Sequence, residues 1–157
     1  MEIPYRVLKL LHVLGAILFV GNIVVTALWK TMADRTRRPE VIAFAQRLVT
    51  TTDFVFTGFG AGLVLGTGLM MARVFGERFW TLPWIAWGMG LFIASGMLWI
   101  TVLVPIQIKQ AHLAAQFAGG TPIPDAYWRL GRLWMTFGSV ATVLPVLNLY
   151  FMVFRPE

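Results

Sequence analysis

The chain of 157 residues contains no cysteine, and this absence excludes several kinds of site. Without thiolates there are no disulfides, no cysteine-ligated zinc, no iron–sulfur cluster and no covalently attached c-type haem. Histidine is scarce, with only His12 and His112. Seven acidic residues stand against thirteen Lys and Arg, which gives a formal net charge of +6. No phosphate-binding or nucleic-acid-binding motif accompanies this basic excess, so we expect no nucleic-acid partner.

Hydrophobic residues make up 58% of the chain, more than is usual in a soluble domain, and they gather in long runs. A helix that spans a bilayer needs about 20 mostly apolar residues. The runs that meet this requirement cover residues 5–29, 54–74, 83–107 and 130–154. None shows the sustained alternation of a β-strand. We therefore expect an all-α membrane protein, a single bundle of four transmembrane helices in direct contact with the lipid bilayer.

The long connection between the first two runs contains a further helical pattern. Pro39 suits the first turn of a helix, and Val41, Phe44 and Leu48 fall on one apolar stripe. We expect this amphipathic helical segment before the second helix either to lie on the membrane surface or to extend that helix outward. Asp53 is suited to cap the second helix at the boundary between the two.

Basic residues are unequally distributed between the two ends of the expected bundle. The end with both termini has five, and the end with the two long connections has eight, Lys30 among them. The positive-inside rule then places the long connections in the cytoplasm and both termini outside. We expect an integral protein of a bacterial inner membrane in this orientation.

His12 lies inside the first apolar run, and its neighbours at helical spacing are mostly small or polar. This stripe consists of Leu8, His12, Gly15, Phe19, Asn22 and Thr26. A polar stripe in a transmembrane helix faces the interior of the bundle. We therefore expect the His12 imidazole to point inward. There it could form a hydrogen bond between helices, relay protons, or ligate a haem or metal.

Among these roles, the basic and glycine residues near His12 favour ligation of a haem. Lys9 is one turn nearer the surface on almost the same face, and Arg6 lies at the same end, so both could pair with haem propionates. Gly62 and Gly66 belong to a glycine face on the second helix. Such a face either packs closely against another helix or leaves room for a flat macrocycle.

A further ligand to the same metal would have to lie at the same depth in the membrane as His12. Met70 and Met71 on the second helix meet this condition, as do Met89 and Asn148, and a five-coordinate haem with an open face is equally allowed. His112 does not meet it. At 1.5 Å per residue it lies about 33 Å from His12 along the membrane normal, on a helical extension where we expect solvent or interface.

The segment Leu8–Gly15, with Phe19-Val20-Gly21 after it, resembles the first helix of the HemJ/CopD-like superfamily of small membrane proteins. The plan of about four helices and the ending Phe154-Arg155-Pro156 are similar too, above all to an uncharacterised integral-membrane branch of that group. Members of the HemJ type bind haem b and oxidise protoporphyrinogen, and members of the CopD type are linked to copper uptake. The resemblance implies that His12 is a haem ligand.

The sequence thus predicts a membrane-embedded protein that binds haem b through His12 and has a redox role, either electron transfer or a HemJ-like oxidation. Whether it is an enzyme stays open. A quinone or a porphyrin-like molecule would be the small-molecule partner, and a second copy of the chain could pack on the glycine face. The alternatives are a copper or small-solute transport protein and a non-catalytic membrane assembly subunit.

Overall fold

The computed structural model describes residues 4–76 and 80–156, and within these ranges it is helical with no strand. The elements in chain order are α1 (Tyr5–Arg35), α2 (Pro39–Thr52), η1 (Asp53–Gly58), α3 (Phe59–Phe75), α4 (Pro83–Leu98), η3 (Trp99–Leu103), α5 (Val104–Phe117) and α6 (Asp125–Phe154). The η1 and η3 segments are π-helical and continuous with the α-helices on either side. The chain therefore forms four long rods: α1, α2–η1–α3, α4–η3–α5 and α6.

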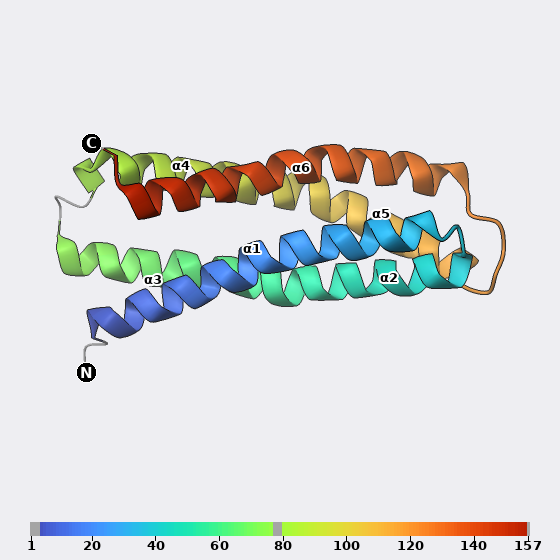
Figure 1. Ribbon diagram of the computed structural model, residues 1–157, viewed down its shortest axis with the longest axis horizontal. Coiled ribbons are helices and arrows are strands. Elements are labelled where there is room, and N and C mark those ends of the chain that lie inside the picture. The colour runs from blue at the N-terminus through green and yellow to red at the C-terminus, as the bar shows by residue number, and fades with distance from the viewer. Residues whose placement is uncertain (1–3, 77–79, 157) are drawn as a thin grey trace.

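The four rods lie side by side in an elongated bundle with both chain ends at the same end (Figure 1). Each is long and apolar enough to cross a membrane. Large apolar side chains cover the outside; Ile17, Phe59, Ile93 and Val153 are each more than half exposed. An apolar outer surface of this kind suits contact with lipid. The predicted all-α, four-helix membrane architecture is confirmed.

The helices extend beyond the apolar runs. α1 continues to Arg35 instead of ending near residue 29, and α6 begins at Asp125 instead of near residue 130. The second rod begins at Pro39 and the third ends at Phe117. The apolar runs marked only the residues suited to lipid, whereas the added turns are amphipathic and still bury one face. The amphipathic segment is therefore an extension of the second helix.

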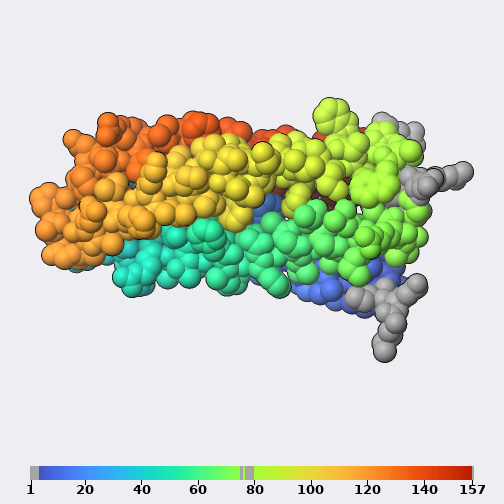
Figure 2. Space-filling view, turned by 180° about the vertical axis from the view of Figure 1, so that it is seen from behind, coloured from blue at the N-terminus to red at the C-terminus, as the bar shows by residue number. Residues whose placement is uncertain are grey.

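The rods pair differently in the two halves of the bundle. Near the termini, α1 packs on α3 and α4 packs on α6, and the backbones of α3 and α4 do not approach each other closely among the described residues. In the other half, α5 packs against α2 and α6, and Figure 2 shows α5 (yellow to orange) seated on α2 (cyan). Phe19 of α1 and Phe92 of α4 meet edge to face between the two pairs, with ring centroids 6.3 Å apart.

Two glycines set the close approach of α1 and α3. A Cβ built on Gly60 would lie 2.8 Å from the Phe19 nitrogen and 2.9 Å from the Gly15 oxygen. Gly62 and Gly66 are instead exposed, and a Cβ on either would meet no atom within 4 Å. The prediction that the Gly62–Gly66 face packs closely against another helix of the bundle is therefore wrong. Gly60 faces α1 and carries that contact.

Candidate functional site

The inward stripe of α1 is confirmed. Leu8, Gly15, Phe19 and Thr26 are buried, and His12 and Asn22 are partly buried. His12 faces α3, where its Nδ1 lies 3.0 Å from the hydroxyl oxygen of Thr67. His12 therefore lies between the first two long helices, as the helical spacing of its neighbours predicts.

The Thr67 hydroxyl determines which imidazole nitrogen carries the proton. Its own hydrogen is donated to the Leu63 carbonyl oxygen, 2.6 Å away, so the oxygen is free to accept. The His12 Nδ1–H is then the donor to Thr67, a tautomer inferred from the hydrogen-bond network. In a neutral ring this leaves Nε2 unprotonated, with its lone pair available.

Gly68 lies directly beside the ring. A Cβ built on Gly68 would be 3.4 Å from His12 Cε1, so the glycine leaves the space of one methyl group next to the imidazole. Gly62 and Gly66 lie on the exposed side of α3 and do not face His12. Lys9 and Arg6 are exposed on the same end of α1 as His12.

The predicted metal ligands of α3 separate into two environments. Met71 is buried and follows Thr67 by one helical turn on the same face, whereas Met70 is 41% exposed on another face. In the described part of the chain, no three His, Cys, Asp or Glu residues lie close enough together to hold a metal ion. Among these residue types, His12 therefore offers a single imidazole. One imidazole is enough to ligate a haem, whereas a metal ion held by protein side chains alone needs three or four ligands.

Of the other candidates, Asn148 has a buried side-chain oxygen and His112 is exposed. The Oδ1 of Asn148 in α6 is buried and has no hydrogen-bond partner among the residues described. It faces α4, where a Cβ on Gly88 would lie 2.9 Å from it. His112 is exposed on α5, in the half of the bundle away from His12, as predicted.

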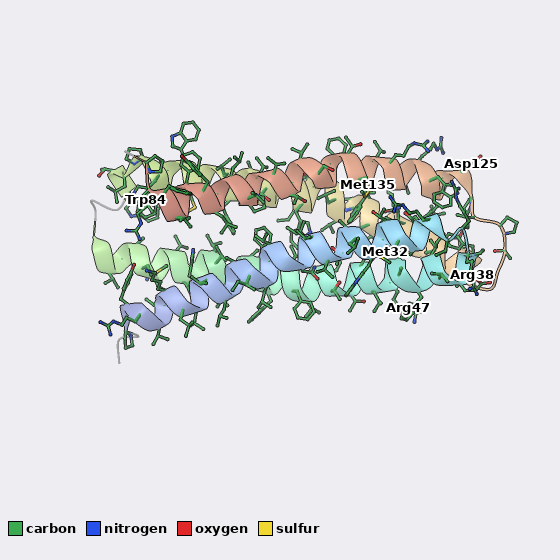
Figure 3. All side chains as sticks on the ribbon, viewed as in Figure 1. Met32, Arg38, Arg47, Trp84, Asp125 and Met135 are labelled. Atoms are coloured by element: carbon green, nitrogen blue, oxygen red, sulfur yellow. The ribbon has the colours of Figure 1, made fainter. Side chains whose placement is uncertain are left out.

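A second polar cluster was missed at the sequence level. Lys30, counted there with the cytoplasmic connection, is 2% exposed inside the bundle. Its ammonium group donates to Gln46 Oε1 at 2.9 Å and to the Tyr127 hydroxyl at 2.8 Å, and lies 3.4 Å from an Asp34 carboxylate oxygen. Arg47, next to Gln46, points away from the bundle (Figure 3). Lys30 could have been recognised because it follows Thr26 by one turn on the inward stripe.

A third polar pair joins the two π-helical segments. Asp53 begins η1 and Trp99 begins η3, and the indole N–H of Trp99 donates to Asp53 Oδ2 at 2.7 Å. The prediction that Asp53 caps the second helix is therefore wrong, because the helix continues through Asp53 without a break. Pro105, shortly after η3, has no N–H to donate to the Thr101 carbonyl, which weakens the regular α-helical ladder there. π-Helical turns are frequent at functional sites.

Comparisons with known proteins identify the family of the chain. Neither the search of curated proteins nor the search of solved structures gives a match. One family model, described as a predicted integral membrane protein (DUF2269), matches residues 6–156. This match covers all four long helices and agrees with their apolar surface. The chain therefore belongs to the DUF2269 family of predicted integral membrane proteins.

Proposed function

We propose that this protein binds haem b in the membrane, with His12 as an axial ligand through Nε2. The observation that carries the proposal is the hydrogen bond from Nδ1 to Thr67. Histidine ligands in metalloproteins commonly donate their second ring N–H to a neighbouring group, which fixes the tautomer and the ring orientation. His12 has this arrangement already, and an ionisable residue inside a transmembrane helix commonly marks a functional site.

The residues around His12 fit such a group. Gly68 keeps one side of the imidazole open, and Lys9 and Arg6 are exposed at the end of α1 where they could pair with propionates. Met71, buried on the Thr67 face, is a better placed second ligand than Met70. Haem would supply one-electron chemistry at this site.

The resemblance of the first helix to the HemJ/CopD-like superfamily supports the same function. We propose a redox role, electron transfer or a HemJ-like oxidation, with a quinone or porphyrin-like molecule as partner. We also propose a bacterial inner membrane with both termini outside the cytoplasm, because the end away from the termini carries more Lys and Arg. The exposed glycine face would be the contact in a homodimer.

The test is an absorbance spectrum of the protein expressed with ample haem and purified in detergent, oxidised and then reduced with dithionite. The proposal predicts a Soret band and reduced α and β bands, with about one haem per chain by the pyridine haemochrome assay. His12→Ala should lose them, and the matched variant His112→Ala should keep them because His112 is exposed in the other half. A wild-type protein without haem would overturn the proposal and leave copper or small-solute transport, or a role in membrane assembly.

A further inference from the structure

A cavity of about 110 Å³ lies in the middle of the bundle, where η1 and η3 face α1 and α6. All four long rods contribute to its wall. Four aromatic rings line it, those of Phe19, Phe92, Trp99 and Trp134. Asp53 is the one charged side chain among the described residues of the wall. The cavity is thus an apolar, aromatic chamber with a single carboxylate.

Asp53 has no cationic partner in the part of the chain that the structure describes. The one hydrogen bond there to its carboxylate comes from the neutral indole of Trp99. The side chain is 8% exposed and lies inside the membrane-spanning rod Pro39–Val74. An ionised carboxylate in such surroundings is costly unless a positive charge or a proton neutralises it.

The polar side chains of the wall are engaged with the protein itself. Thr57 accepts a hydrogen bond from Asn22, and Ser95 donates to the Ala141 carbonyl. Gln107 accepts from the Trp134 indole and donates to a backbone carbonyl of α2. None of the other described wall side chains, from α1, η1, α3, α4, η3, α5 or α6, carries a charge. Lys30, one turn beyond Thr26, is held by its own partners and is not part of the wall.

The chemistry of the wall indicates what would neutralise Asp53. Aromatic faces attract organic cations such as alkylammonium ions, and a carboxylate adds the opposite charge. A strongly hydrated metal ion would instead lose its water shell without a set of oxygen ligands to replace it. The volume limits the ligand to a small one, because a larger cavity of about 150 Å³ accommodates a ligand of only benzene size.

We propose that Asp53 and the surrounding rings bind a small monovalent alkylammonium ion, whose charge neutralises the carboxylate. The site lies in the middle of the bundle and is distinct from His12. It uses the two π-helical segments, which place Asp53 and Trp99 next to each other in the cavity wall. The proposal holds whether or not His12 binds a haem.

The first experiment measures binding of radiolabelled methylammonium to the detergent-purified chain by equilibrium dialysis. We expect saturable binding of about one ion per chain. Tetrabutylammonium should not displace it, because it exceeds the cavity. Asp53→Asn should weaken binding about tenfold or more, whereas Asp125→Asn should not, because Asp125 is exposed at the start of α6.

A second pair of variants separates loss of the site from loss of the fold. Gly96 lines the cavity and Gly90 does not, yet both lie on α4 and neither has an atom within 4 Å of an added Cβ. Gly96→Val should fill the cavity and abolish binding with Asp53 intact, and Gly90→Val should bind as the wild type does. The proposal is overturned if the wild-type protein shows no saturable binding, or if Gly96→Val and a folded Asp53→Asn both bind as tightly as the wild type.

Discussion

The ammonium group of Lys30 lies 2.8 Å from the hydroxyl oxygen of Tyr127, a residue 97 positions further along the chain. The contact joins α1 to α6, and Gln46 of α2 completes it with its own oxygen 2.9 Å from Lys30. The Tyr127 hydroxyl in turn donates to Asp34 Oδ1 or to Gln46 Oε1. Since a buried ammonium is tolerated only when it is paired, this cluster stabilises the relative positions of three helices.

Tyr127→Phe tests that role. The substitution keeps the ring and removes the hydroxyl, so Lys30 loses one hydrogen-bond acceptor in a buried position. We expect a loss of about 1–3 kcal/mol, which lowers the midpoint of thermal unfolding in detergent by several degrees. Tyr150→Phe is the control, because Tyr150 is 51% exposed. Equal midpoints for the two variants would show that the Lys30 cluster contributes nothing to stability.

Gly60→Ala tests the close approach of α1 and α3. The new methyl group would lie 2.8 Å from a backbone nitrogen and 2.9 Å from a backbone oxygen, neither of which can move without the helix. We expect destabilisation of about 1–3 kcal/mol, as for overpacking in other tight interiors. Gly62→Ala, two residues away and open to its surroundings, should be neutral or stabilising by up to about 1 kcal/mol because alanine favours helix. Thermal unfolding that ranks the two variants the other way would contradict the observed interface.

Thr67→Val tests the orientation of His12. Valine has nearly the shape of threonine but cannot accept the Nδ1–H proton, so the imidazole loses its anchor. We expect haem affinity to fall about 10–100-fold, measured by titration of haem into the protein freed of it. Thr101→Val, which alters an exposed threonine bonded only to its own helix, should leave the affinity unchanged. An unaltered affinity in Thr67→Val would mean that the hydrogen bond does not position the ligand.

Reporter fusions test the orientation in the membrane. Alkaline phosphatase is active only outside the cytoplasm, and green fluorescent protein fluoresces well only inside it when exported by the general pathway. Fused after Arg155, the phosphatase should be active and the fluorescent protein dark. Fusions in the connection after Phe117 should give the reverse pattern, because that end carries more Lys and Arg. The opposite result at both positions would invert the proposed topology.

The inward face of α1 could be predicted from the sequence because the helical period is regular over its whole length. The positions of Leu8, His12, Gly15 and Phe19 follow from spacing alone, and the structure places each of them toward the bundle. The same period extends to Lys30, yet a lysine after an apolar run is normally read as the end of a transmembrane segment. Its burial depends on Gln46 and Tyr127, which lie on other helices.

Asp53 could not be predicted as an interior residue, for a different reason. A carboxylate before an apolar run is a common helix cap, and nothing local distinguishes the two cases. The distinction comes from Trp99, 46 positions later, which supplies the buried hydrogen bond. The glycines show the same limit. Spacing by four singled out Gly62 and Gly66, whereas the helix contact is made through Gly60 and Gly15.

The central claim, that His12 ligates haem through Nε2, is tested most directly by His12→Gly with imidazole added to the buffer. Removing the side chain opens a space beside Thr67 that free imidazole can enter, and there it would take the place of the His12 ring as ligand to a bound haem. We predict that His12→Gly purifies with little haem or with an altered Soret band, and that imidazole restores the wild-type oxidised and reduced spectra. A His12→Gly protein that keeps the wild-type spectrum without imidazole would contradict the claim, since the iron would then be held by another residue.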